Sequence, residues 1–447
     1  MNAGNAANSA RSELPILALG GVFVLTLLIG GGTSAGLLTD SILQVVTIVV
    51  CVSILVTKAS TNISWPLLVF PMLILLAIAL QLVPLPVQWV QPYWPSAVKA
   101  AWVAADPGSH FGFITTNVER TLGVFTYAAS AMVLLWTLGS LQPSQLGAIV
   151  SYIALGIFAN MLVAFIQLSL RQFEPINDIL SYPIKVGFFA NQNHFATLLL
   201  ITIPFLDFRY YWGPHLRSLL NLAMVMFFLL AAGSIAGIVV GFVLSIISFA
   251  VLSKSGLQKS LTRAVILLAL AAFGAGAWQQ IFSIDFAAKV KRIEIFRTTL
   301  DAIRDAPVTG SGYGSFVQTY QIFEKAKDIN AEYINHAHND FAELIMEGGL
   351  IAAALIGLYL VLLIYKFVSQ FHRTQVRAAF LSILAVLTHS LVDYPLRTMA
   401  IMYLFVYAHA VMFAADASTP QRELEPKKKS RKRRSKSEAI PAVVPAI

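Results

Sequence analysis

The sequence has very little cysteine and little charge. Its single cysteine, Cys51, lies inside an apolar run, which excludes a disulfide framework and a thiolate metal site. Only 12% of the 447 residues are charged, whereas 57% are hydrophobic and the mean hydropathy is +0.73. Soluble domains carry roughly 25% charged residues, so a polytopic membrane protein is predicted. The first apolar run is long and no small-residue cleavage pattern follows it, so no cleavable signal peptide is predicted.

The sequence also lacks a distributed basic surface of the kind that binds nucleic acid, although its net charge is +9. Eight of the 31 Lys and Arg residues lie in one short segment, KKKSRKRRSK at 427–436. The polar, basic segment 419–447 is therefore predicted to be a disordered cytoplasmic tail. It either anchors the topology or lies near anionic lipid headgroups. No nucleic-acid partner is expected, and residues 1–418 are predicted to form the transmembrane domain.

Apolar runs long enough to cross roughly 30 Å of hydrocarbon occur about twelve times. Only Gly233 and Ser234 separate two of them, so whether both are full crossings stays open. No internal repeat divides the chain. The predicted fold class is an all-α polytopic membrane protein of about 12 transmembrane helices. The predicted spans are 15–38, 41–57, 65–83, 121–140, 146–170, 190–206, 218–232, 235–252, 262–281, 349–368, 376–393 and 398–415.

The distribution of basic residues indicates the orientation of these spans. With a cytoplasmic N-terminus, nearly every short inner segment carries Lys or Arg, as the positive-inside rule requires. An even number of spans also places the basic tail inside. The outer segments are then 84–120, 171–189 and 282–348. The last is too long for a plain connector, so it is expected to contain short helices and to carry function. The inner basic residues are Lys58, Arg209, Arg217, Lys254, Lys259, Arg263, Lys366, Arg373, Arg377 and those of the tail.

Cations on the predicted outer face are candidates for binding an anion. Arg292 and Arg297 lie in KVKRIEIFRTTLDAIRDAP (289–307), and Lys185 precedes VGFFANQNHFA. The alternative is surface pairing, because Glu294, Asp301 and Asp305 have helical spacing for ion pairs with these arginines. Several cations from separate outer segments favour a phosphate or pyrophosphate ligand at the membrane surface.

The neighbouring segment PVTGSGYGSF (307–316) is rich in glycine. It lacks the Lys-Ser/Thr ending of a Walker loop. A turn that permits close backbone approach is therefore favoured over a phosphate cradle.

The segment NHAHNDFAELIMEGG (335–349) gathers the most titratable chemistry. Asp340 and Glu343 are interpreted as a helix-start capping box, and Gly348–Gly349 as a break before the next span. His336 and His338 then precede a helix N-terminus, where the helix dipole favours the neutral state that a general base needs. A zinc site and a purely structural histidine are the alternatives. His338 is the favoured base, and the role of His336 stays open.

Two other segments place polar groups at the edge of predicted spans. NQNH (191–194) opens one span and HSLVDYPLRT (389–398) closes another. Polar groups at membrane depth are costly unless paired, so the two segments are expected to share a cavity. Asp393 and Arg397 are interpreted as neutralising each other at the outer edge.

Three pieces of the sequence together resemble the O-antigen ligase and O-antigen polymerase superfamily of bacterial membrane glycosyltransferases. Their order and the long outer segment agree with that family over roughly residues 120–415. The three pieces are GFFANQNHFATLL (187–199), KRIEIFRTTLDAIRDAPVTGSGYGSF (291–316) and HAHNDFAELIMEGGLIA (336–352).

The resemblance implies a metal-independent enzyme of the GT-C type in the bacterial inner membrane, without a cofactor and with its active site on the periplasmic face. Such enzymes transfer a glycan from an undecaprenyl-diphosphate carrier to a sugar hydroxyl on a glycan or a lipid-linked acceptor. It implies that His338 is the general base and that Arg292, with Arg297 and Lys185, holds the diphosphate. Other polysaccharide-assembly proteins are further candidate partners. Supporting or substrate-binding roles fall to His336, Asn339, Asn191 and Asn193.

One departure separates the sequence from the ligase branch of that family. Ligases tend to follow His-Asn with a later Gly-x-x-Gly, whereas Gly349 is followed three residues on by Ala352. Polymerisation of O-antigen or exopolysaccharide repeat units is therefore favoured, with ligation to lipid A core as the alternative. A transporter or lipid flippase is the rival from another class, but no two related halves are detected. An intramembrane metalloprotease is excluded because its His-Glu-x-x-His motif is missing.

Overall fold

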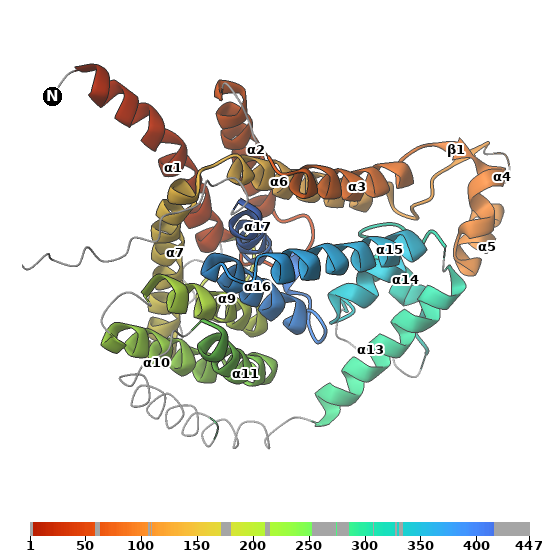
Figure 1. Cartoon of the computed structure of the whole chain (residues 1–447). Coiled ribbons are helices and arrows are strands. Elements are labelled where there is room, and N and C mark those ends of the chain that lie inside the picture. The colour runs from red at the N-terminus through yellow and green to blue at the C-terminus, as the bar shows by residue number, and fades with distance from the viewer. Residues whose placement is uncertain are drawn as a thin grey trace, which may run out of the picture. The chain divides into compact units, whose positions relative to one another are not determined.

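The computed structural model shows an assembly of α-helices with a minimal two-stranded β-sheet in the described part of the chain (Figure 1). In this sheet, β1 (Leu85–Pro86) pairs antiparallel with β2 (Phe111–Gly112). Two short 3-10 helices, η1 (Gln91–Tyr93) and η2 (Pro395–Arg397), accompany the α-helices. The structure describes residues 3–58, 63–105, 108, 110–170, 180–210, 215–252, 274, 286–306, 308–326, 329 and 334–414. The α-helices in this part of the chain are α1 (Ala3–Ile29), α2 (Leu38–Thr57), α3 (Trp65–Gln81), α4 (Val87–Val90), α5 (Ser96–Ala105), α6 (Val118–Gly139), α7 (Pro143–Leu170), α9 (Gln192–Tyr210), α10 (His215–Ala232), α11 (Ile235–Leu252), α13 (Phe286–Asp305), α14 (Phe316–Phe323), α15 (Asp340–Ser369), α16 (Thr374–His389) and α17 (Met399–Ala414).

Among the described helices, α2, α6, α7 and α15 are each long and apolar enough to cross a membrane. Shorter apolar helices occupy other predicted spans, within α1, α3, α10, α11 and α17. The helical part of the prediction is therefore confirmed, with four candidate membrane spans among the described helices, whereas the count of about 12 spans stays a prediction. The predicted span 262–281, apart from residue 274, and the tail 419–447 lie outside the described residues.

The first predicted span ends earlier than expected. Helix α1 stops at Ile29 and α2 begins at Leu38, so residues 30–37 form a connection and not the end of a span. This connection starts with three consecutive glycines, 30–32, which have low helix propensity. The early stop matters for the site described below, because the connection contacts the start of α15.

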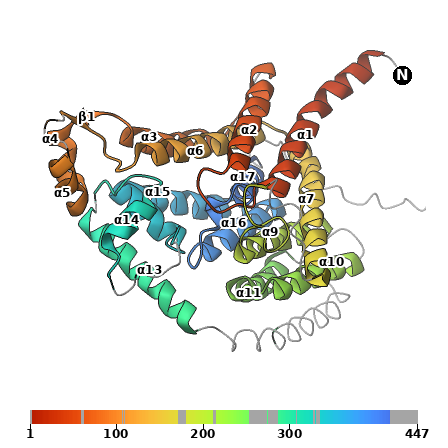
Figure 2. The same cartoon turned by 180° about the vertical axis from the view of Figure 1, so that it is seen from behind.

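Helices α9, α16 and α17 form the buried centre of the described helices. In Figures 1 and 2 they lie between α3 and α6 on one side and α10 and α11 on the other. Their contacts agree, because α9 packs against α10, α11 and α16, and α17 packs against α6 and α16. Tyr403 of α17 and Phe195 of α9 are fully buried. By contrast, only Ala352, Leu363 and Lys366 are buried in the part of α15 that follows Gly349, so most of that part is available to face lipid.

A kink divides α15 at the predicted break. Gly349 adopts φ 58° and ψ −144°, a conformation open to glycine but not to residues with a Cβ. A Cβ at Gly349 would also lie 2.4 Å from the carbonyl oxygen of Val308. The kink and the glycine-rich segment 308–316 therefore pack backbone against backbone, as the turn interpretation predicts.

Three amides of that segment point to acceptors within the protein. Ser311 and Gly312 donate to the carbonyls of Met346 and Glu347, at 3.0 and 2.9 Å, and Tyr313 donates to the Gln81 side chain at 2.8 Å. A phosphate cradle needs amides that point to the ligand. These bonds therefore favour the turn interpretation over a cradle.

The described parts of the predicted outer segments contain short helices and loops. Residues 84–112 contain α4, α5 and the two-stranded sheet, and the segment 282–348 contains α13 and α14. The backbone amide and hydroxyl of Ser96 donate to the Asp305 carboxylate, at 2.6 and 2.7 Å. These bonds tie the start of α5 to the end of α13.

Candidate functional site

Backbone hydrogen bonds bring segments distant in sequence together at the start of α15. The amide of Asp340 donates to the carbonyl of Ser390 (3.0 Å), which joins α15 to the chain after α16. The amide of Ala400 donates to the carbonyl of Gly30 (3.0 Å), which brings in the connection after α1. Because the main chain is fixed in this way, the polar side chains of these segments meet in one place. The segments are 30–33, 190–194, 336–347 and 389–398.

Arg397 is the centre of a buried charge cluster. Its guanidinium lies 3.1 Å from Glu347, 3.4 Å from Glu343 and 3.7 Å from Asp340. Side-chain exposure is at most 2% for the three carboxylates and 16% for Arg397. Burial alone would lower the pKa of Arg397, but the three carboxylates raise it further above its usual value. Arg397 is thus a permanent cation that offsets charges which would be very costly if left unpaired.

This cluster corrects two predictions about the same residues. Among the described residues Arg397 pairs with the α15 carboxylates and not with Asp393. The capping-box interpretation of Asp340 and Glu343 is also wrong, because the N-cap is Asn339, whose side chain accepts from the Ala342 amide at 2.9 Å. The two carboxylates point instead into the protein, where they face Arg397.

His336 is held between two hydrogen-bond acceptors. Its Nδ1 lies 2.8 Å from Glu343 Oε1, and its Nε2 lies 3.2 Å from the carbonyl oxygen of Thr33. Since both partners only accept, each ring nitrogen must carry a proton, which makes the ring an imidazolium. Burial would lower the pKa of His336, but the charge and hydrogen bond of Glu343 outweigh it and raise that pKa. A histidine in this state has no lone pair to act as a base.

His338 lies two residues further on in very different surroundings. Its Nδ1 is 3.4 Å from Asp393 Oδ1, and a quarter of its side chain is exposed. Among the described residues its Nε2 has no hydrogen-bond partner. The backbone of His338 has φ 53°, in the left-handed region that residues with a Cβ rarely adopt. This histidine therefore has one nitrogen next to a carboxylate and the other free for a ligand.

Asp393 connects the two segments that were predicted to share a cavity. The Asn193 side-chain amide donates to its Oδ2, and the Tyr394 amide donates to its Oδ1 at 2.9 Å. His194 Nε2 lies 3.9 Å from the same carboxylate. Burial would raise the pKa of Asp393, but the adjacent His338 and the imidazoles of His194 and His389 hold it well below its usual range. Asp393 is therefore a fixed anion next to His338.

The predicted anion-binding residues lie near this site to different degrees. Arg292 is exposed, and its guanidinium is 3.5 Å from the carbonyl of Val392, one residue before Asp393. Arg297 is exposed one to two turns further along α13, and Lys185 is exposed in the segment before α9. The structure therefore brings Arg292, but not Arg297 or Lys185, into contact with a segment of the site.

The surface-pairing alternative holds for one arginine of α13. Arg304 forms a 2.8 Å ion pair with Asp301, and its side chain is 73% exposed.

Sequence reasoning missed Glu347 and Tyr394. A signal for Glu347 was available, because Asp340, Glu343 and Glu347 are spaced three and four apart and so share one helix face. Tyr394 had no such signal, since its contacts depend on the path of the chain after α16. Its ring lies against the imidazoles of His336 and His338, with ring centroids 4.2 and 5.1 Å apart.

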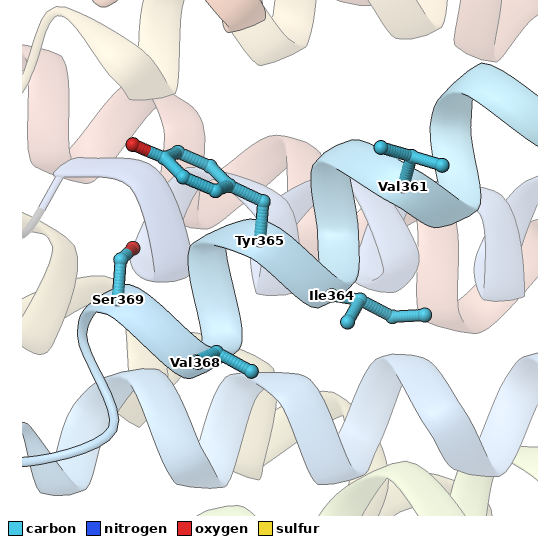
Figure 3. A pocket seen from close by; sticks show the side chains of 5 residues that line it. All are labelled: Val361, Ile364, Tyr365, Val368 and Ser369. Carbon is cyan, nitrogen blue, oxygen red and sulfur yellow. The ribbon is translucent and has the colours of Figure 1, made fainter.

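An apolar groove on α15 lies far from this chemistry (Figure 3). It has a volume of about 430 Å³ and is lined by Val361, Ile364, Tyr365, Val368 and Ser369 of that helix alone. At 1.5 Å per residue, it begins roughly 30 Å along α15 from Asp340. Its lining offers no titratable group apart from a tyrosine, which is typical of a lipid-facing surface.

The fold and the site together define a membrane-embedded protein with a titratable centre at one end of its central helices. Among the described residues, no three His, Cys, Asp or Glu side chains are arranged to hold a metal ion. A family model described as O-antigen ligase matches residues 219–357. The matched region includes α13, α14 and the first part of α15, and thus both His336 and His338. This match confirms the predicted resemblance to the O-antigen ligase and polymerase superfamily and supports an O-antigen ligase-type function. No curated protein matches the chain.

Proposed function

We propose that the protein is an inner-membrane glycosyltransferase of the GT-C type that works without a metal ion. It moves a glycan from an undecaprenyl-diphosphate carrier to a sugar hydroxyl at the periplasmic face. In this proposal the chain has about 12 spans and cytoplasmic termini. The observation that carries the proposal is the environment of His338, with Asp393 at one ring nitrogen, a second nitrogen that has no partner among the described residues, and a partly exposed ring.

His338 is suited to act as the general base. Its Nε2 accepts the proton of the acceptor hydroxyl while the hydroxyl oxygen attacks the anomeric carbon of the donor sugar. The bond between that carbon and the diphosphate oxygen breaks, and the diphosphate leaves with the electron pair. Asp393 stabilises the imidazolium that results, because it is a fixed anion 3.4 Å from Nδ1.

Cations on α13 supply the complementary charge for the leaving group. Negative charge grows on the diphosphate as the bond breaks, so fixed cations stabilise the transition state more than the ground state. Arg292 is the first candidate because it contacts the segment that carries Asp393. Arg297 and Lys185 are proposed to extend the same anion site.

The amide side chains have supporting roles in this proposal. Asn193 holds Asp393, and Asn339 caps α15 and also donates to the carbonyl of Leu391 at 2.9 Å. The hydroxyl of Tyr394 lies within hydrogen-bond reach of Asn191. His336 belongs to the framework as a cation paired with Glu343, and not to the proton transfer.

Polymerisation of O-antigen or exopolysaccharide repeat units is the first candidate activity. Its support is the departure from the ligase pattern at Ala352, which is buried and packs beside Gly348. Ligation of the glycan to lipid A core is the second candidate, favoured by the description of the matching family.

The test is a transfer assay with purified protein in detergent and an undecaprenyl-diphosphate glycan as donor. A ladder of products of increasing length identifies a polymerase, and a single transfer to added lipid A core identifies a ligase. Unchanged turnover in EDTA is expected. His338→Ala is expected to abolish most of the product, whereas His372→Ala, a change at an exposed histidine on the segment between α15 and α16, is the matched control.

Three results would contradict the proposal. Full activity of His338→Ala would remove His338 as the base, and EDTA-sensitive turnover would remove the metal-free chemistry. Movement of the lipid-linked glycan across proteoliposomes without any new glycosidic bond would favour the transporter alternative.

A further inference from the structure

Tyr394 lies among three imidazoles at the centre of the site. Its ring centroid is 4.2 Å from that of His336, 4.9 Å from that of His194 and 5.1 Å from that of His338. The His194 contact is edge-on at 89°, and the His338 contact is inclined at 63°. Tyr394 is only 5% exposed. Its ring therefore contacts both the charged His336 and the partly exposed His338.

The hydroxyl of Tyr394 is held by two amide side chains. It lies within hydrogen-bond reach of the side chains of Asn191 and Asn335. These two asparagines come from the segments before α9 and α15, so the ring is anchored from both sides. Burial raises the pKa of Tyr394 to about 12, which keeps the phenol neutral and able to hold both contacts.

His338 needs such support because its backbone is strained. Among the described residues, the only non-glycine residues with positive φ are Ser181 and His338, whose φ is 53°. A residue in this region is strained and persists only when its surroundings hold it there. The Asp393 contact at 3.4 Å is long for a charge-assisted hydrogen bond. It therefore leaves the plane of the imidazole to be set by the packing of Tyr394.

We propose that Tyr394 is a positioning residue that sets the imidazole plane of His338 through ring packing. This inference rests on the proposed role of His338 as general base. Tyr394 contacts His338 and not the exposed cations of α13, so it acts on proton transfer and not on donor binding.

The test compares Tyr394→Phe and Tyr394→Leu in the transfer assay. Phenylalanine keeps the ring but loses both amide contacts, so a small fall in kcat is expected. Leucine removes the ring, and kcat is expected to fall about 10- to 100-fold, as misplacement of a catalytic group does. The KM for the donor is expected to stay unchanged in both variants. Tyr407→Phe and Tyr407→Leu are the matched controls, because Tyr407 is equally buried and its hydroxyl bonds to the carbonyl of Leu146 in the helix core.

A second comparison separates positioning from general packing. In the His338→Ala background, Tyr394→Leu is expected to cause no further loss of the residual turnover, because Tyr394 acts through His338. An equal fold-loss in both backgrounds would overturn the inference, as would a raised donor KM with unchanged kcat. If Tyr394→Leu does not fold, Tyr394→Phe decides the question: a fall in kcat as large as that expected for loss of the ring would overturn the inference, because phenylalanine keeps the ring. If His338→Ala loses activity but both Tyr394 variants keep the wild-type kcat, the inference about Tyr394 is wrong and the proposed function stands. Full activity of His338→Ala defeats the proposed function itself.

Discussion

Two histidines only two residues apart have different hydrogen-bond partners in this protein, although each has a carboxylate beside its Nδ1. His336 has a hydrogen-bond acceptor at each ring nitrogen and is 12% exposed, whereas His338 has one carboxylate at 3.4 Å and is 25% exposed. The first is a structural imidazolium, and the second has an Nε2 without a hydrogen-bond partner among the described residues. The sequence motif by itself does not distinguish the two histidines. The difference shows that the partners of a histidine, and not its motif, decide whether it can act as a base.

The largest effect is expected from removing the free histidine. His338→Ala should lower kcat by about 10²- to 10⁴-fold, the usual contribution of a general base. Its free energy of unfolding should change little, because the side chain has no close hydrogen bond and sits in a strained backbone that alanine does not worsen. The measurement is steady-state transfer, together with thermal unfolding in detergent. A large fall in the free energy of unfolding would mean that His338, like His336, has a structural role.

The next largest effect is expected from replacing Arg397, the cation that faces the three buried carboxylates of α15. Arg397→Met leaves three buried carboxylates facing only one imidazolium, and breaking a buried pair in this way costs about 3–5 kcal/mol. The free energy of unfolding should fall by that amount. Arg304→Met is the matched control, since an exposed pair contributes less than about 1 kcal/mol. Equal stability of the two variants would mean that the cluster around Arg397 is hydrated and not buried.

A smaller loss of stability is expected from replacing the charged histidine. His336→Gln keeps a donor for Glu343 but removes the positive charge, which should destabilise the fold by about 1–3 kcal/mol, the cost of leaving a buried polar group poorly paired. Activity per folded molecule should remain far above that of His338→Ala. If instead the two variants lost activity to the same extent at equal stability, both histidines would belong to the chemistry.

The smallest effect is expected from pH. The pKa of His336 is raised in the folded state, so its stabilising contribution is complete below the unfolded value of about 6.5 and is lost as pH rises through the folded pKa. The loss is partial, because a neutral ring still fills the site. Asp393 has a depressed pKa, so its contribution persists above about pH 4 and declines only at lower pH.

Thermal unfolding between pH 5 and 9 checks this expectation. The wild type should become less stable towards the alkaline end, and His336→Gln should lack that dependence. An unchanged alkaline slope in the variant would assign the titration to another group.

Several features of the fold could be predicted from residues alone. The apolar runs predict the helices, and the pair Gly348–Gly349 predicts the break in α15, because only glycine tolerates the backbone angles found at position 349. The glycine-rich segment is correctly interpreted as a close-packed turn. The first span is predicted too long, since a hydropathy pattern does not register that the glycines 30–32 end the helix.

Pairing of charges could not be predicted in the same way. Asp393 and Arg397 are four residues apart, a spacing that places two side chains on one face only if the chain between them is helical. Helix α16 ends at His389, and the chain continues through a loop into η2, so the two side chains diverge. Asp393 then faces His338, and Arg397 faces the carboxylates of α15.

The sequence by itself determined that this is a helical membrane protein and which segments carry its chemistry, because hydropathy and family motifs are local properties of the chain. Only the tertiary structure decided which histidine is charged and which is free. That distinction depends on Thr33, Glu343 and Asp393, which come from three separate segments. Their positions are set by backbone contacts between helices and not by spacing along the chain.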